Sequence, residues 1–406
     1  MTNTTSILAH PAHVPADRVI DFDLYDFPVA GVEYQRGMKK ILESNPAEVL
    51  WSPRNGGHWI AKSPQTVATV FTDSKHFSSR RIIVEEVERT TPPLVPLQLD
   101  PPHHEGYRAL LQQALSPKAV GKLGDKARAL SIELIEGFKD KGECEFISAF
   151  AQHLPIAIFM GIVDLPEADR PLLTEISEIA MRGETEAERS EAVGKLVVYG
   201  MGKVAERRAN PGNDLISAIT RAEVNGKLID DATLTGLILL LLLGGLDTVA
   251  STMGFIAQFL ATHPEHRHAL VADPSLIPNA TEELLRRFPI ATNAREVKAD
   301  VELGGVLLKA GDMVLVATTM DGLDNSKFPD PLTVDFNRLK PGANSTFGGG
   351  VHRCVGSMLA RTELRIFLEE WLQRIPDFSI KAGTNPKVSA RAVATITSLE
   401  LVWPVQ

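Results

Sequence analysis

Apolar residues recur at the three-to-four spacing of helices over most of the chain, chiefly between about residues 103 and 290 and again at 66–71. Two apolar runs flank an Asn-Gly-Gly turn in residues 49–61, which predicts a β-hairpin. Strand-like runs return at 297–318 and at 378–403. The pattern therefore predicts a mainly α fold with a minor β region, whose strands come from segments far apart in the sequence.

The most apolar stretch, residues 233–263, contains one formally charged side chain, Asp247. Its length would suffice for a membrane span, but an aspartate near the centre costs about 2.5–3.5 kcal/mol on insertion scales. Small and polar residues recur along it at spacings of three and four, as one stripe made of Gly244, Asp247, Thr248, Ser251 and Thr252. We therefore predict a helix that is buried in a protein core and turns this stripe toward a cavity.

The composition narrows the class of protein. Lys and Arg number 42 against 51 Asp and Glu, a net charge of −9, which argues against nucleic acid as the main partner because phosphate binding needs a dense basic surface. Hydrophobic residues at 44% and charged residues at 23% are typical of a globular protein. Two cysteines, Cys144 and Cys354, favour a reducing cytoplasm over a disulfide framework. The amino terminus has no basic start followed by an apolar core, so we expect no secretion signal there.

Even composition without a long linker predicts one domain over residues 1–406. We expect residues 1–30 to form an N-terminal arm. Prolines at 92, 93 and 96 predict an irregular loop over 78–99. The charged stretch 165–210 is predicted to form lid helices over the buried region, with ordinary exposed helices as the alternative.

The most informative segment is the glycine-rich loop 347–356, which contains three consecutive glycines and Cys354. Such glycines can adopt positive φ and let a flat ligand approach the backbone. Cys354 stands just before a helical pattern, where backbone N–H groups and the helix dipole favour the thiolate, the form that binds metal. Three interpretations remain open from this segment by itself: a metal-binding thiolate, an inert cysteine in a glycine turn, or a nucleophile paired with His352.

The order Phe-x-x-Gly-x-x-x-Cys-x-Gly matches the haem-binding signature of the cytochrome P450 superfamily at Phe347, Gly350, Cys354 and Gly356. Three further motifs agree with that family in the expected order. Residues 244–248 resemble its distal-helix motif, Glu283-x-x-Arg286 resembles its Glu-x-x-Arg pair, and 328–338 resembles the segment that supplies a third partner, Arg338. The resemblance covers essentially the whole chain and is greatest to the soluble bacterial type represented by camphor 5-monooxygenase. It implies the P450 fold and a haem-thiolate monooxygenase, with haem b between a distal and a proximal helix.

The resemblance also implies roles for single residues. Cys354 would be the axial iron ligand, and thiolate ligation favours cleavage of the O–O bond. Phe347 would pack near the sulfur, and Gly350, which has no side chain, would leave space for the loop. The implied partners of the haem propionates are Arg108, Arg295, His352 and His104.

Two residues of the distal helix are implied in oxygen activation by the same resemblance. The Thr248 hydroxyl would donate a hydrogen bond, and Asp247 would relay protons from solvent; a threonine bonded to a helix carbonyl is the alternative. Glu283, Arg286 and Arg338 would form a structural ion-pair network away from the substrate.

Apolar residues around these motifs are expected to line the substrate pocket: Ile83, Pro92, Leu94, Leu240, Leu243, Gly244, Ala291, Ala392 and Val393. The camphor type holds its ketone with a tyrosine where this chain has Pro92, and residues 78–99 contain no tyrosine. We therefore expect a compact terpenoid or norisoprenoid rather than camphor, hydroxylated at an unactivated C–H bond.

No flavin or nicotinamide reductase segment occurs in the sequence, so the resemblance implies a [2Fe-2S] ferredoxin as electron donor, itself reduced by a nicotinamide-dependent reductase. Arg353, Arg361 and Arg365 would form a basic patch for that acidic partner, or else an ordinary charged helix face. We expect a monomer without membrane contact that uses O2. The alternatives are a peroxide-driven peroxygenase, a non-catalytic haem sensor or carrier, and a helical scaffold without cofactor.

Overall fold

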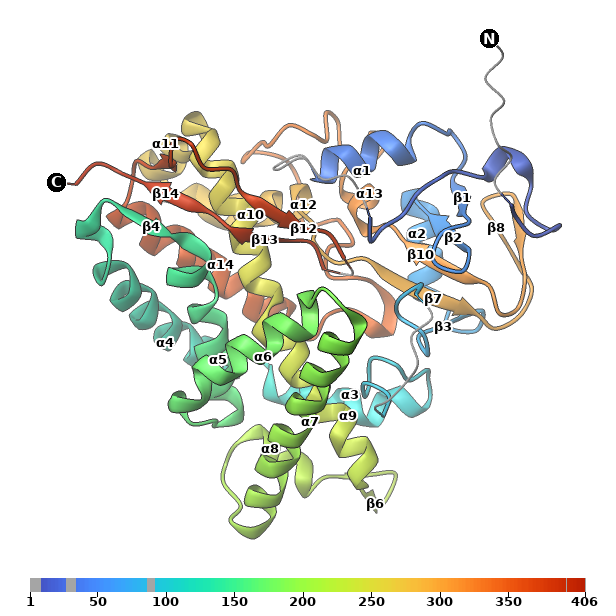
Figure 1. Cartoon of the computed structure of the whole chain (residues 1–406), viewed down its shortest axis with the longest axis horizontal. Coiled ribbons are helices and arrows are strands. Elements are labelled where there is room, and N and C mark those ends of the chain that lie inside the picture. Colours follow the sequence, from blue (N-terminus) through green and yellow to red (C-terminus); the bar gives the residue numbers. More distant parts are fainter. Residues whose placement is uncertain (1–8, 27–33, 86–91, 392, 406) are drawn as a thin grey trace.

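The computed structural model describes residues 9–26, 34–85, 92–391 and 393–405 (Figure 1). Helices fill one side of the molecule, and the largest sheet lies on the other, beside the N-terminal segment. The α-helices are α1 Tyr34–Leu42, α2 Pro64–Thr72, α3 His103–Ala114, α4 Pro117–Glu136, α5 His153–Val163, α6 Arg170–Arg182, α7 Glu186–Ala209, α8 Leu215–Thr220, α9 Asp231–Leu246, α10 Thr248–Thr262, α11 Pro264–Ala272, α12 Ile277–Arg287, α13 Thr318–Gly322 and α14 Ser357–Arg374.

The strands are short and widely spaced along the chain. They are β1 Val49–Ser52, β2 His58–Ala61, β3 Phe77–Ser78, β4 Glu143–Glu145, β5 Glu223–Val224, β6 Lys227–Leu228, β7 Asn293–Val297, β8 Val301–Leu303, β9 Val306–Leu308, β10 Met313–Val316, β11 Ser379–Ile380, β12 Lys387–Ser389, β13 Thr395–Ser398 and β14 Glu400–Val402. The fold is therefore mainly α with a minor β region in one domain, as the sequence pattern predicts.

The largest sheet has the strand order β1-β2-β10-β7-β3. β1 and β2 form the predicted hairpin, in which Trp51 lies opposite Trp59. β10 runs parallel to β2 and antiparallel to β7, where Val314 lies opposite Arg295. The sheet thereby fixes the backbone on both sides of Arg295.

The predicted helix over 233–263 is two helices, α9 and α10, which meet at Asp247 with φ −127° and ψ −38°. The glycine pair Gly244-Gly245 stands just before the break. Glycine weakens a helix, so this pair accounts for the position of the break. α10 is buried continuously from Ala250 to Ala261, although the whole stretch is long and apolar enough to cross a membrane. Packing inside the protein identifies α10 as a core helix.

An aromatic cluster fixes α14 against the segment before α5. The ring of Trp371 lies 5.0 Å from that of Phe146 and 5.4 Å from that of Phe150, and Phe367 lies 5.5 Å from Phe146. Such edge-on contacts add to the burial of the rings themselves. α14 is therefore a rigid support for the loop that precedes it.

Most other predictions about local structure are confirmed. Residues 66–71 lie in α2. Of the predicted loop 78–99, Ser78 instead ends β3, where it pairs with Glu296 of β7, and the described parts 79–85 and 92–99 contain no helix or strand. The stretch 165–210 contains α6 and α7, whose role as a lid stays a prediction. Only residues 9–26 of the predicted N-terminal arm are among those described, and they include one 3-10 turn, Ala16–Arg18.

Candidate active site

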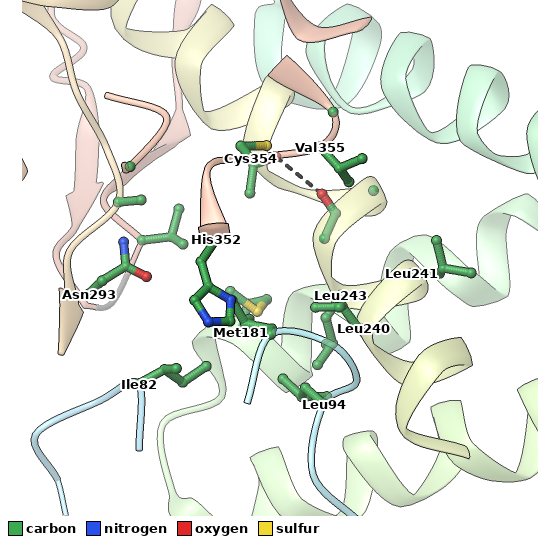
Figure 2. Close-up of a pocket in the computed structure, with 18 of the residues that line it drawn as sticks. Ile82, Leu94, Met181, Leu240, Leu241, Leu243, Asn293, His352, Cys354 and Val355 are labelled. Carbon is green, nitrogen blue, oxygen red and sulfur yellow. Dashed lines mark hydrogen bonds between the residues drawn. The ribbon is translucent and has the colours of Figure 1, made fainter. Parts of the chain in front are cut away.

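A cavity of about 1260 Å³ lies between the α9–α10 break and the glycine-rich loop that leads into α14. Figure 2 shows Cys354 and His352 on that loop, with Leu240 and Leu243 of α9 lying across the cavity. Leu94 of the proline-rich loop and Met181 of α6 close another side. Segments from the whole chain thus surround one internal space.

The conformation of the loop depends on two glycines at positive φ, Gly348 at 69° and Gly350 at 60°. A Cβ atom on Gly350 would lie 2.2 Å from the carbonyl oxygen of Phe71 at the end of α2, so no larger residue fits. The N–H of Cys354 donates to the carbonyl oxygen of Phe347 at 2.9 Å. These contacts fix where the sulfur points.

The Cys354 side chain is open to the cavity but otherwise surrounded by protein. Burial raises the pKa of its thiol, whereas the N–H of Gly356 and the charges of Arg108, Arg353 and Arg361 lower it. A donor and three cations around a sulfur favour the thiolate once a metal ion removes the proton. The site therefore suits a thiolate ligand.

Three cationic or donor side chains on and beside the Cys354 loop lack partners for some of their polar atoms. Both ring nitrogens of His104, Nε2 of His352 and Nε of Arg108 are buried without a hydrogen-bond partner among the described residues. The two imidazole rings lie 4.4 Å apart. Because an unpaired buried donor costs about 1–3 kcal/mol, this cluster fits an anionic ligand.

Arg295 of β7 belongs to the same cluster. It is 3% exposed, and burial lowers the pKa of its guanidinium to about 10. Nη1 donates to the carbonyl oxygen of Ala294 at 2.7 Å, and the guanidinium lies over the ring of Phe71 at 5.4 Å. Burial likewise lowers the pKa of His352 to about 3, helped by the charge of Arg295. A ligand with two carboxylates would relieve both groups.

Asp247 does not line the cavity. Its carboxylate accepts hydrogen bonds from Arg182, the last residue of α6, and from Ser251 at 3.3 Å. Arg182 also donates to Ser251 at 3.3 Å. The predicted single polar stripe is thus wrong in this detail, because Asp247 and Ser251, one helical turn apart, face α6 instead of the cavity.

The cavity-facing stripe consists of Gly244, Thr248 and Thr252, each four residues apart. Thr248 Oγ1 donates to the Gly244 carbonyl oxygen at 3.2 Å, which leaves its lone pairs free to accept. A Cβ on Gly244 would meet nothing within 4 Å, whereas one on Gly245 would lie 2.3 Å from Cδ2 of Phe159 in α5. The two glycines therefore serve different purposes: Gly244 leaves space, and Gly245 permits close helix packing.

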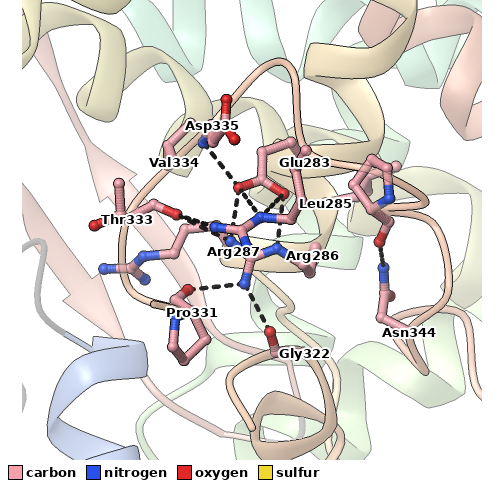
Figure 3. A network of polar contacts seen from close by, with 12 residues as sticks. Glu283, Leu285, Arg286, Arg287, Gly322, Pro331, Thr333, Val334, Asp335 and Asn344 are labelled. Atoms are coloured by element: carbon pink, nitrogen blue, oxygen red, sulfur yellow. Dashed lines mark hydrogen bonds and ion pairs between the residues drawn. The ribbon is translucent and has the colours of Figure 1, made fainter. Parts of the chain in front are cut away.

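Glu283, Arg286 and Arg338 form the compact network of Figure 3. Arg286 donates to both carboxylate oxygens of Glu283 at 2.7 Å, and Arg338 Nε lies 3.0 Å from Glu283 Oε1. Arg286 Nη1 also donates to the carbonyl oxygens of Gly322 and Pro331 at 2.7 and 2.8 Å, and Nη2 donates to that of Thr333 at 3.2 Å. Glu283 and Arg286 are fully buried and lie outside the cavity lining.

Eight of the nine predicted pocket residues line the cavity, and the ninth, Ala392, lies outside the described residues. The eight are Ile83, Pro92, Leu94, Leu240, Leu243, Gly244, Ala291 and Val393. Ala291 and Val393 form a backbone bridge that ties the segment before β7 to the one before β13. Phe347, His352, Arg108, Arg295, His104 and Gly356 also line the cavity.

Sequence reasoning missed Tyr25, Met181, Arg182 and Asn293. Tyr25, Met181 and Asn293 line the cavity, and Arg182 holds Asp247. Tyr25 lies in an arm without periodicity, so no pattern points to it. Met181 and Arg182 end α6, a helix whose position over the α9–α10 break is set by tertiary packing.

The predicted basic patch is smaller than expected. Arg361 is partly buried and binds Glu282 of α12 through Nε and Nη2, the second contact at 3.0 Å. Its guanidinium also stacks on the ring of Phe347 at 4.5 Å. Arg353 and Arg365 remain exposed.

The residues present fit haem b. The cavity joins a sulfur held by a glycine loop to a separate cluster of buried, partly unpaired donors that suits two propionates, and apolar side chains lie between. Cys354 would bind the iron, while Arg108, Arg295, His104 and His352 would hold the carboxylates. Fold and site together define a haem-thiolate protein.

Comparisons with known proteins agree. The family model "Cytochrome P450" matches residues 162–398. A probable cytochrome P450 127A1 from Sinorhizobium fredii is 31% identical over 97% of this chain and 96% of its own, and mycinamicin IV hydroxylase/epoxidase from Micromonospora griseorubida is 30% identical over 83% and 87%. The crystal structure of CYP101J2 is similar with a TM-score of 0.89 and 39% identity, covering 98% of this chain and all of that one. The structure of CYP101C1 has the same TM-score and coverage at 36% identity.

The chain belongs to the cytochrome P450 family. It is a P450 monooxygenase that binds haem b, of the soluble bacterial type similar to CYP101.

Proposed function

We propose that this monooxygenase hydroxylates a compact terpenoid or norisoprenoid in the cytoplasm, as a monomer, with electrons from a [2Fe-2S] ferredoxin. The observation that carries the proposal is the position of Cys354: its sulfur faces a mostly apolar cavity whose opposite wall is the Gly244–Thr248 turn at the helix break. Similarity to CYP101J2 and CYP101C1 supports the same class.

The bound haem supplies the redox chemistry on dioxygen. Cys354 would bind it, and its loop, fixed through Gly350 and Phe71, keeps the sulfur in place. Arg108 and Arg295 would neutralise the propionates, and the two histidines would donate hydrogen bonds to them. Gly244 leaves space for a small molecule across the cavity from Cys354.

Proton supply depends on the helix break. Thr248 donates its single hydroxyl hydrogen to the Gly244 carbonyl oxygen, so its own oxygen can accept a hydrogen bond in the cavity. The hydroxyl must turn away from Gly244 before it donates a hydrogen bond there. Asp247 next to it is held by Arg182 and Ser251 on the side of α6. In this mechanism the carboxylate moves protons from that side, and Thr248 delivers them inside.

The apolar lining selects substrate by shape and desolvation. Leu240 and Leu243 of α9 face Leu94, Ile83 and Pro92 of the proline-rich loop. Pro92 has no hydroxyl to bind a ketone, which supports a substrate other than camphor. Tyr25 of the N-terminal segment also lines the cavity.

Electron transfer is proposed to occur on the face outside the Cys354 loop. Arg353 and Arg365 are exposed there, and Val351 and Met358 expose 43% and 44% of their surface beside them. Cations around an apolar patch suit an acidic ferredoxin. Because Arg361 is already paired with Glu282, we expect charge reversal at Arg353 to slow ferredoxin-driven turnover more than reversal at Arg361.

The absorption spectrum of the reduced, carbon-monoxide-bound protein tests the proposal, with Cys354→Ser and Cys144→Ser as a matched pair. We expect the thiolate-type spectrum to be lost in the first variant and kept in the second. Titration with terpenoids and norisoprenoids should then shift the spin state of the resting iron. Turnover with hydrogen peroxide but not with ferredoxin would identify a peroxygenase, and ligand binding without oxygen consumption would identify a sensor or carrier.

A further inference from the structure

Glu363 of α14 is a carboxyl group that nothing in the proposed mechanism uses. Its side chain is 1% exposed, yet it is among the residues that line the cavity. Oε1 is buried and has no hydrogen-bond partner among the described residues. A buried carboxylate without a partner is strongly disfavoured, so this group carries a proton at neutral pH.

Several charged side chains on the helices around Glu363 are bound to other partners. On α14 and α12, Arg361 binds Glu282, and Glu283 binds Arg286. Further ion pairs on the helices packed against α14 include those of Arg128 of α4 with Glu369 and Glu370, of Arg374 with Glu136 and Glu370, and of Arg267 of α11 with Asp377, while Arg365 of α14 is exposed to solvent.

α10, which also packs against α14, contains no Asp, Glu, Lys, Arg or His between Thr248 and Thr262. Burial is accordingly the one cause that raises the pKa of Glu363, to about 8. That value lies within reach of physiological pH, so a modest change in local charge would change the protonation state.

Two hydroxyl groups line the same cavity from neighbouring elements. Thr252 Oγ1 donates to the Thr248 carbonyl oxygen at 3.1 Å, and Thr346 Oγ1 donates to the Leu285 carbonyl oxygen at 2.9 Å. Both hydroxyl oxygens can still accept a hydrogen bond from water or from a carboxylic acid. The wall of the cavity therefore offers hydroxyl oxygens to water and to a protonated carboxyl group.

We propose that Glu363 couples the redox state of the haem to protonation in alkaline solution, where part of its carboxyl groups are ionised: there it takes up a proton from solvent when one electron from the external donor enters the haem. The proton converts the carboxylate to the neutral acid, so the added negative charge is balanced within the same cavity. The inference rests on the proposed haem-thiolate site.

The expected size of the coupling follows from the helix. Ser357, the first residue of α14, stands three residues after Cys354. At 1.5 Å per residue, Glu363 lies about 9 Å further along the helix. A unit charge at about 10 Å, with an effective dielectric constant of about 20, changes a pKa by about one unit, a tenfold change in proton affinity. For a one-electron couple, that tenfold change corresponds to about 59 mV.

The test is the reduction potential of the haem-loaded protein, measured by spectroelectrochemistry from about pH 6 to pH 9.5. In the wild type we expect the potential to fall by about 59 mV in total as the pH rises through the region of the Glu363 pKa. Glu363→Gln should remove that fall while its potential at pH 6 stays close to that of the wild type. Glu363→Asp should keep a fall, and Glu369→Gln, on the same helix but paired with Arg128, should behave as the wild type.

Identical profiles for the wild type and Glu363→Gln would overturn the inference. If the Gln variant does not take up haem, infrared difference spectra of the wild type labelled with 13C-glutamate decide instead. A protonated carboxyl band that grows on reduction at pH 8 supports the inference, and no change in that band overturns it. The carbon-monoxide spectrum of the same samples reports the thiolate ligand separately, so loss of the proposed function is distinguishable from loss of this coupling.

Discussion

Gly245→Ala adds one methyl group where α9 packs closely against Phe159 of α5, near the active site. Its Cβ would lie 2.3, 2.7 and 2.9 Å from Cδ2, Cγ and Cε2 of Phe159, three atoms of one ring. Ordinary carbon contacts lie at about 3.5–4.0 Å. The ring or the helix must therefore move by about 1 Å, in a core where Phe159 is 6% exposed.

Gly244→Ala is the matched control, because the same methyl group would meet nothing within 4 Å. Both substitutions gain about 1 kcal/mol of helix propensity, so this contribution cancels in their difference. Overpacking a core costs about 1–3 kcal/mol. We therefore expect Gly245→Ala to be less stable than Gly244→Ala by about 1–3 kcal/mol.

Thermal unfolding of the haem-loaded variants measures this difference. For a chain of this length, 1 kcal/mol corresponds to about 1 °C in the midpoint, so the two variants should differ by about 1–3 °C. Phe159→Leu combined with Gly245→Ala should recover part of the loss. Equal midpoints for the two alanine variants would refute the packing argument, since the structure gives them different surroundings.

Three further variants test buried polar groups. Arg286→Lys loses the planar guanidinium that binds Glu283 and the carbonyl oxygens of Gly322 and Pro331. It should reduce the free energy of unfolding by about 3–5 kcal/mol, measured by thermal scans, and the retention of haem, measured by absorbance. Burial lowers the pKa of His58 to about 4, so as the pH falls the unfolded state takes up the His58 proton before the folded state does. The free energy of unfolding should therefore drop by about 3 kcal/mol between pH 6.5 and pH 4, and His58→Gln should lose less over the same range. Burial raises the pKa of Glu363 to about 8, so the wild type should lose up to about 4 kcal/mol of stability between pH 4.5 and pH 8, and Glu363→Gln should show a flatter profile in denaturant titrations.

Much of the fold is readable from local pattern. The hairpin around the Asn-Gly-Gly turn, the helix at 66–71 and the mainly helical centre follow from spacing and turn chemistry, because these depend on neighbours along the chain. The prediction for residues 233–263 was one helix, and the break at Asp247 was found only in the structure. How the stripe divides between the cavity and α6 was not predicted either, because one residue of helical rotation separates the two faces.

The site was predicted best where the chain itself carries the chemistry. Cys354 and its glycines form a continuous motif, so their position on the cavity follows from sequence. The pairing of Arg182 with Asp247 joins residues 65 positions apart and depends on how α6 lies over the core. The neutral state of Glu363 depends on burial by several helices, and no spacing rule reports burial of a single acid.

The backbone bridge between Ala291 and Val393 has a consequence for how substrate preference can change. Hydrogen bonds reinforce this part of the wall: Ala394 N–H donates to the Ile290 carbonyl oxygen at 2.8 Å, and Ala294 N–H donates to that of Ile82 at 2.9 Å. Strands fastened in this way hold their separation whichever molecule enters. New substrates should therefore be accommodated by exchanging side chains on a fixed frame, and evolution would act on individual lining residues more than on the course of the chain.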